Sequence, residues 1–170
     1  MSTPIKRFLS WGDIESKVLE IARQMAIDEW RPDLIVGITR GGAMPAVMLS
    51  HYFECKMVGL DVSLRDSDTG PESNLWLPED ALVGKRILIV DDINDSGATI
   101  NWIINDWESS VAVSIKDTPF PWGENVRFAV LIDNEMSDST QMHYAGETIN
   151  KREKDEWIVF PFEDFWTRRQ

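Results

Sequence analysis

The stretch that most constrains the fold is residues 87–100, which read ILIVDDINDSGATI. It opens on a run of large apolar residues and then places Asp91, Asp92 and Asp95 in quick succession. A short apolar run bounded by polar residues predicts a buried strand, and apolar residues at helical spacing over 98–107 predict a helix directly afterwards. The stretch is therefore predicted to run from a buried strand through an acidic loop into a helix.

The same alternation of strand, turn and helix is found along the rest of the chain. Further strands are predicted over 34–38, 56–64, 85–90 and 126–133, with a short last strand at the start of 156–166, and helices over 11–30, 43–53 and 98–107. Residues 65–80 and 109–124 lack periodicity and are predicted to be irregular. Strands that alternate with helices predict the α/β class, a mainly parallel twisted sheet covered by helices on both faces. The 170 residues fit a single domain, 1–170.

The charge balance argues against some classes of partner. The 17 basic and 29 acidic residues give a net charge of −12, whereas broad binding of nucleic acid or of an anionic membrane needs a positive field. A small anion stays possible, because a phosphate responds mainly to local amides and one or two cations. The single cysteine, Cys55, permits no internal disulfide. With no signal peptide and no apolar run of ~18 residues, a cytoplasmic location is expected.

The loop over 91–99 combines two kinds of chemistry. The start of a helix offers free backbone N–H groups to a phosphate, Gly97 allows a close approach, and Ser96 and Thr99 add hydroxyl donors. The aspartates would repel that phosphate, but carboxylates suit sugar hydroxyls or a phosphate-bound Mg²⁺. A phosphorylated ribose presents both faces, so such a ligand is predicted. In the alternative interpretation the acids merely end the strand, and Asp95 with Ser96 caps the helix.

A second glycine-bearing turn, Thr39-Arg40-Gly41-Gly42, also follows a predicted strand and precedes a helix. Arg40 supplies a fixed cation with a forked set of donors. Such a turn alone is often ordinary. In an α/β sheet, however, ligands bind beyond the carboxyl ends of the strands, where both loops are expected. Two anion sites at one sheet edge indicate a ligand with two phosphate groups.

These residues resemble a known family. VDDINDSGAT, residues 90–99, is similar to the signature of the type I phosphoribosyltransferases. TRGGAMPAVMLS, 39–50, and DEWIVFPFED, 155–164, are similar to segments of the bacterial xanthine–guanine (purine) phosphoribosyltransferases. The resemblance implies a Rossmann-like fold with a flexible lid loop at about 64–80, a small C-terminal hood at about 134–170, and a homo-oligomer, either dimer or tetramer. Residues 109–124 fit poorly and resemble an insertion.

The resemblance also implies an activity and a donor site. Such enzymes are glycosyltransferases that use 5-phosphoribosyl-1-pyrophosphate and Mg²⁺, and they convert a nucleobase into a nucleoside monophosphate in purine salvage. By resemblance, the 5′-phosphate is held by Asp95, Ser96, Gly97, Ala98 and Thr99, the ribose and metal by Asp91 and Asp92, and the pyrophosphate by Thr39, Arg40 and Gly41. Mg²⁺ is expected at Asp92, mostly through the ligand and water. Asp95 is the expected catalytic residue, placed near the purine N7 to assist its deprotonation.

Base recognition is where the chain departs from the family. Trp157 matches the residue that stacks on the purine, and Ile158 the residue whose backbone reads an exocyclic group. The family carries a lysine at the end of the strand over 126–133, to donate to the purine 6-oxo group. Here Asn134 follows that strand, with no lysine close to it in sequence. Asn134 is therefore the expected base contact, and it can donate or accept.

Several alternatives stay open at this point. The base is expected to be hypoxanthine, guanine or xanthine, but adenine or a pyrimidine is conceivable without the family lysine. A protein of this fold could also bind phosphoribosyl pyrophosphate or a nucleotide without turnover. His51 and His143 have no metal-binding spacing and are expected to be structural or surface residues.

Overall fold

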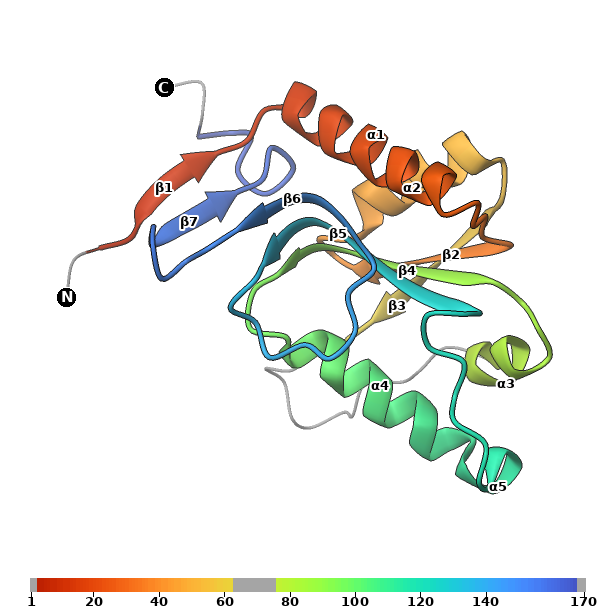
Figure 1. Cartoon of the computed structure of the whole chain (residues 1–170). Helices are drawn as coiled ribbons and strands as arrows, with labels where there is room; N and C mark the ends of the chain where they lie inside the picture. The colour runs from red at the N-terminus through yellow and green to blue at the C-terminus, as the bar shows by residue number, and fades with distance from the viewer. Residues whose placement is uncertain (1–2, 63–75, 168–170) are drawn as a thin grey trace.

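The computed structural model of the chain describes residues 3–62 and 76–167. Its centre is a parallel sheet with the strand order β3-β2-β4-β5-β6. The strands of this sheet are β2 (Leu34–Thr39), β3 (Lys56–Asp61), β4 (Ile87–Asn94), β5 (Val126–Asn134) and β6 (Tyr144–Ile149). Helices cover both faces, with α1 (Trp11–Ile27) and α2 (Ala43–Phe53) on one face, and α3 (Leu77–Leu82), α4 (Ala98–Ser110) and α5 (Ala112–Ile115) on the other (Figure 1). The predicted α/β class is confirmed.

The apolar runs of the central strands are explained by these two helical layers. Side chains of a strand point alternately to opposite faces of the sheet. In β4, Leu88 and Val90 pack in the core beneath α1 and α2, while Ile87 and Ile89 pack in the core beneath α4. A strand that is buried on both faces therefore carries apolar residues at successive positions rather than at alternate ones.

The first helix has a sequence signal at its start that the structure shows directly. The Ser10 hydroxyl accepts the Asp13 N–H at 3.1 Å, and the Asp13 carboxylate accepts the Ser10 N–H at 2.7 Å. This reciprocal cap satisfies backbone donors that a helix leaves without partners at its first turn. The helix ends at Ile27, earlier than the predicted Trp30.

Several boundaries predicted from the sequence are wrong. The short helices α3 and α5 lie in segments predicted to be irregular, and β6 and β1 (Ile5–Phe8) are not predicted at all. β1 is a short and largely exposed edge strand, and β6 carries little apolar alternation, so neither gives a clear periodic signal. Most of the predicted lid over 64–80 lies outside the described residues, and its last part, Leu77–Asp80, is helical.

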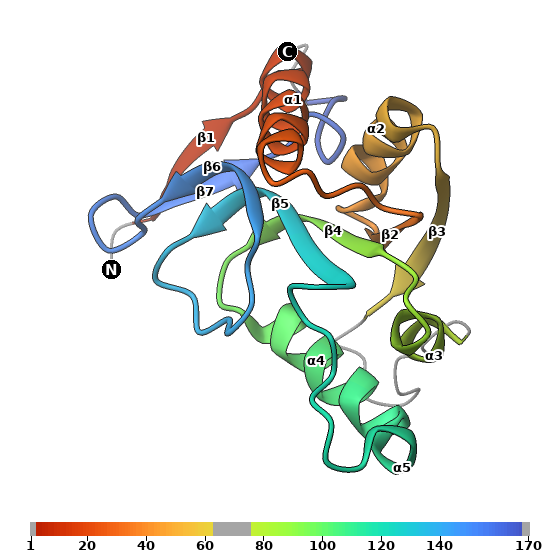
Figure 2. The same ribbon diagram turned by 45° about the vertical axis from the view of Figure 1, so that its right-hand side comes forward.

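A second, two-stranded parallel sheet joins the two ends of the chain. β1 pairs with β7 (Glu156–Val159), next to β6 (Figure 2). Arg7 of β1 donates two hydrogen bonds to Glu147 of β6, at 2.7 and 3.0 Å. Lys17 of α1 lies 2.7 Å from the same carboxylate. The Arg7 pair links the small sheet to the main one, the Lys17 pair links α1 to the same strand, and β7 brings Trp157 and Ile158 toward the end of β4. No described helix has the length and apolar character needed to cross a membrane.

Candidate active site

The two loops singled out in the sequence lie against each other. β2 and β4 are adjacent parallel strands, so the loops that follow them emerge at the same sheet edge. Their contact is so close that a Cβ added to Gly41 would lie 2.1 Å from the Asp92 Oδ2 atom, and one added to Gly42 would lie 2.2 Å from the Val90 carbonyl oxygen. At Gly42 the obstacles are backbone atoms, so only glycine fits, whereas a side chain at Gly41 would have to displace the Asp92 carboxylate. The backbone of the Arg40 loop therefore lies directly beside the acidic end of β4.

The loop between β4 and α4 forms a cradle at the start of the helix. Gly97 precedes the first residue of α4 and has a φ of 87°, a conformation that glycine adopts without strain. The Ser96 hydroxyl accepts the Ala98 N–H at 3.3 Å. Residues 91–100 with Trp157 line a cavity of about 300 Å³. The N-terminus of α4, where a helix leaves backbone amides without intrahelical partners, thus opens on this cavity.

The loop that follows β5 supports this cradle from behind. The Asp138 N–H donates to the Ser96 carbonyl at 3.0 Å, and the Asn101 side chain donates to the Asp138 carbonyl at 2.9 Å. Asn94, buried at the end of β4, donates to Asp133 at 2.7 Å, to Ser137 at 2.8 Å and to Ser139 at 2.9 Å. Sequence reasoning missed Asn94; the available signal was its polar side chain at the end of a strand that begins with four buried apolar residues.

Asp91 and Asp92 belong to the strand rather than to the loop, because β4 continues to Asn94. Burial raises the pKa of Asp91 well above its ordinary value, and the neighbouring Asp92 carboxylate raises this pKa further. Burial also raises the pKa of Asp92, although the hydrogen bonds that Asp92 makes with Asp91 and with the Ile93 N–H lower it again. Glu163 adds a smaller upward contribution to the Asp92 pKa. Paired, desolvated carboxylates of this kind suit a divalent cation, whose charge would compensate both.

These raised pKa values lead to a test on stability. The pKa of Asp91 is higher in the folded than in the unfolded protein. Between these two pKa values the folded state binds more protons than the unfolded state, so stability falls as the pH rises from the lower value to the higher one. We expect Asp91→Asn to raise the free energy of unfolding by about 1–3 kcal/mol at about pH 8, and to have little effect at about pH 3.5. Denaturant unfolding across this pH range measures the difference.

Asp117→Asn is the matched control, because Asp117 is exposed and the substitution makes the same change of charge. Our interpretation of Asp91 would be wrong if both variants changed stability equally, or if the effect of Asp91→Asn did not grow with pH.

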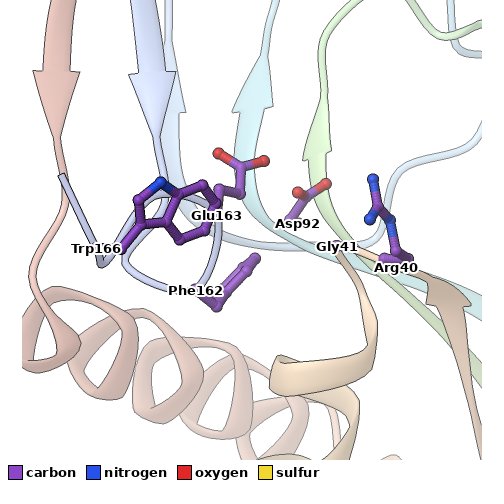
Figure 3. A pocket seen from close by; sticks show the side chains of 6 residues that line it. All are labelled: Arg40, Gly41, Asp92, Phe162, Glu163 and Trp166. Atoms are coloured by element: carbon purple, nitrogen blue, oxygen red, sulfur yellow. The ribbon is translucent and has the colours of Figure 1, made fainter.

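The Arg40 side of the site opens into a cavity of about 670 Å³ lined by Arg40, Gly41, Asp92, Phe162, Glu163 and Trp166. Figure 3 shows Asp92 between the cationic Arg40 and the carboxylate of Glu163. The Thr39–Arg40 peptide bond is cis, and the Thr39 hydroxyl donates to the Leu60 carbonyl at 3.2 Å. Glu163 accepts the Phe160 N–H at 3.0 Å. Arg40 and the neighbouring backbone thus provide a cationic wall, and Asp92 and Glu163 provide an acidic one.

A smaller cavity of about 110 Å³ lies on the other side of Asp95, lined by Ile93, Asp95, Lys151, Trp157, Ile158, Phe160 and Glu163. Trp157 is 55% exposed, whereas Ile158 is buried. The cavity is therefore bounded mainly by apolar and aromatic surface, with charged groups at its edge.

Asn134, the expected base contact, makes several hydrogen bonds within the protein. Asn134 is buried, and its amide donates to the Asp95 carbonyl at 2.9 Å. Its side-chain oxygen accepts the N–H groups of Met136 and Lys151, each at 3.3 Å. The side chain thus makes its hydrogen bonds to the protein itself and joins three segments of backbone at the edge of the small cavity.

Lys151 is a site residue that sequence reasoning missed. Its ammonium group lies 2.8 Å from the Asp95 carboxylate. It comes from the turn between β6 and β7, far along the chain from the end of β5, and β6 itself was not predicted. No local pattern could have placed this lysine at the site.

The two histidines lie in contexts that fit structural roles. His143 accepts the Phe128 N–H through its Nδ1 atom at 3.0 Å. Burial lowers the pKa of His143 to about 4, so the ring is neutral at physiological pH. His51 is exposed in the last turn of α2.

Comparisons with known proteins identify the family of the chain. Residues 5–164 match the phosphoribosyl transferase domain family. The chain is 25% identical to the hypoxanthine-guanine phosphoribosyltransferase of Schizosaccharomyces pombe, over 94% of this chain and 90% of that protein. It is 22% identical to the bacterial xanthine-guanine phosphoribosyltransferase of Idiomarina loihiensis, over 92% of this chain and 86% of that protein.

Among solved structures, the fold resembles that of a purine phosphoribosyltransferase from Pyrococcus horikoshii, with a TM-score of 0.67 and 24% identity. The similarity covers 94% of this chain and 95% of that one. Because the family match extends over nearly the whole chain and includes both loops of the site, the protein belongs to the phosphoribosyltransferase family.

Proposed function

We propose that the protein transfers the 5-phosphoribosyl group from phosphoribosyl pyrophosphate to a purine, either hypoxanthine, guanine or xanthine. The products are a nucleoside monophosphate and pyrophosphate, as nucleotide salvage requires. The observation that carries the proposal is the contact between the Arg40 loop and the acidic end of β4, beside the cradle at Gly97. A sugar with a phosphate at one end and a pyrophosphate at the other fits this arrangement.

Each part of the donor has a complementary group. The amides and hydroxyls of residues 95–99 bind the 5′-phosphate, since they surround the start of α4. The backbone of Thr39 and Gly41 and the side chain of Arg40 bind the pyrophosphate. Asp91 and Asp92 bind the ribose hydroxyls. Their high pKa values are lowered when a cation or hydroxyl donors compensate the buried charge.

Mg²⁺ is the expected cofactor; Asp92 would hold it together with the donor and water, and it would neutralise charge on the pyrophosphate. Among the described residues, no group of three or more histidine, cysteine or acidic side chains is arranged to hold a metal.

The reaction breaks the bond between ribose C1 and the pyrophosphate oxygen and forms a bond between C1 and a nitrogen of the base. Positive charge develops on the ribose, and carboxylates close to it lower the energy of this transition state. Asp95 takes the proton that the base gives up, because its carboxylate faces the small cavity beside Trp157. Trp157 stacks on the base, and Ile158 contacts its edge through the backbone.

A panel of bases tests the proposal. The protein is incubated with phosphoribosyl pyrophosphate, Mg²⁺ and, separately, hypoxanthine, guanine, xanthine, adenine, uracil and orotate, and monophosphates are measured by chromatography. We expect product with the 6-oxopurines. If the donor binds tightly and no base yields product, the protein is a non-catalytic binder of the same ligand, and the proposal is wrong.

A further inference from the structure

Lys151 has an unusual environment for a lysine. Its side chain is 19% exposed and its ammonium group lies 2.8 Å from the Asp95 carboxylate, which is itself 51% exposed. Lys154, in the same turn, is 69% exposed. A lysine side chain is seldom buried unless its ammonium group is paired, because the charge is strongly hydrated. The head of Lys151 is thus directed into the wall of the small cavity, where Asp95 also lies.

The position of Lys151 is fixed by the backbone and not only by its charge. The Lys151 N–H donates to the Asn134 side-chain oxygen at 3.3 Å, and the same Asn134 amide donates to the Asp95 carbonyl at 2.9 Å. Asn150 stabilises the turn, since its side chain accepts the N–H groups of Arg152 at 3.0 Å and Glu153 at 3.3 Å. One buried asparagine therefore holds the backbones of both members of the Lys151–Asp95 pair.

The rest of the cavity suits a flat aromatic ring. Trp157, Ile158 and Phe160 give it apolar walls. At its edge stand the Lys151 ammonium, which can only donate hydrogen bonds, and the Asp95 and Glu163 carboxylates, which accept them when ionised. The cavity thus combines apolar surface with a donor and an acceptor, Lys151 and Asp95, that lie side by side.

This pairing matches one edge of a 6-oxopurine. The oxygen on C6 is an acceptor, and the neighbouring N7 carries a proton in one tautomer of the free base. A 6-aminopurine instead presents two hydrogen-bond donors at C6. A C6 oxygen that faces the Lys151 ammonium would accept a hydrogen bond from it. A C6 amino group in the same place would put one donor against another, and neither would have an acceptor.

We propose that Lys151 is the specificity-determining residue that reads the base. In this assignment, which rests on the proposed function, the ammonium moves from its bond with Asp95 to the 6-oxo group of the purine. Asp95 is then free to accept the N7 proton. The free protein keeps both groups paired, and 6-oxopurines are selected over adenine.

Substitution of Lys151 with a base-by-base readout tests this assignment. Lys151→Met retains the length of the side chain but removes the donor. We expect kcat/KM for hypoxanthine to fall between about 10- and 150-fold, the range for losing a hydrogen bond to a charged group. The values for adenine and the KM for phosphoribosyl pyrophosphate should change by less than about threefold. Lys151→Arg keeps a cation and should retain the preference for hypoxanthine over adenine.

Arg152→Met is the matched control, because it removes the same charge from the next residue, which is exposed. We expect it to leave both kcat/KM values unchanged. Calorimetric titration with inosine and adenosine monophosphates gives a second readout that does not require turnover. The affinity for inosine monophosphate should fall in Lys151→Met, while that for adenosine monophosphate should not.

The outcomes separate the two proposals. If the wild-type protein converts 6-oxopurines and Lys151→Met keeps the same preference, the proposed function stands and the role of Lys151 is refuted. A wild-type preference for adenine would also refute it. If no base is converted, the proposed function fails, but a loss of inosine monophosphate binding confined to Lys151→Met would still support the reading role.

Discussion

Asp95→Asn should lower kcat for the transfer reaction between about 100- and 10,000-fold, the contribution that a well-placed general base makes. The asparagine keeps the shape of the side chain but cannot take the proton from the base. The affinity for phosphoribosyl pyrophosphate should change by less than about threefold, because residue 95 contributes its backbone to the phosphate cradle. Initial rates of monophosphate formation and calorimetric titration with the donor measure the two quantities.

The variant also removes the charged partner of Lys151, whose ammonium group lies 2.8 Å from the Asp95 carboxylate, but it leaves the backbone of the loop supported. Asp95 is half exposed, and the hydrogen bond from Asn134 reaches its backbone carbonyl, so the loop keeps its support. Asp117→Asn serves as the control, since it makes the same change at an exposed position. Equal activity in Asp95→Asn and the wild type would remove Asp95 from the mechanism.

Gly97→Ala should weaken the binding of phosphoribosyl pyrophosphate by about 100-fold, the scale expected when a binding group is displaced by about 1 Å. The added methyl group would lie 2.4 Å from the backbone nitrogen of Ser139. Backbone cannot move aside as a flexible side chain can, so the cradle or the loop behind it must shift. Titration with the donor and Mg²⁺ measures the loss.

Gly84→Ala separates this displacement from backbone strain. Gly84 has a φ of 101°, yet an added Cβ would meet none of the described residues within 4 Å. Both variants carry the strain of a left-handed alanine, about 1–2 kcal/mol, but only Gly97→Ala moves the cradle. If the two variants bound the donor equally well, the 5′-phosphate would not lie at Gly97.

The parts of the fold that were predictable are those with local signals. The apolar run of β4, the helical spacing in α4 and the cap at Ser10 each depend on neighbours in sequence. From them the parallel sheet follows, and with it the meeting of the two loops at one edge. β6 was missed because its sequence, YAGETI, has only one buried residue, Tyr144, and depends for its pairing on β5.

The base end of the site shows why the remainder was not predictable. Sequence reasoning looked for a cation at the end of β5 and found Asn134. The folded chain brings Lys151 there from a turn after an unpredicted strand, and Asn134 holds it in place. Such a contact joins residues through tertiary structure, and neither composition nor periodicity carries information about it.

The central claim is that the protein joins a phosphoribosyl group to a base, and ³¹P nuclear magnetic resonance tests it most directly. The protein is mixed with phosphoribosyl pyrophosphate and Mg²⁺, with or without hypoxanthine, and the spectra are followed over time. We predict that the donor diphosphate signals disappear, and that free pyrophosphate and a nucleoside monophosphate appear in equal amounts, only when hypoxanthine is present. Donor signals that persist with hypoxanthine, or that decay equally without it, would contradict the account.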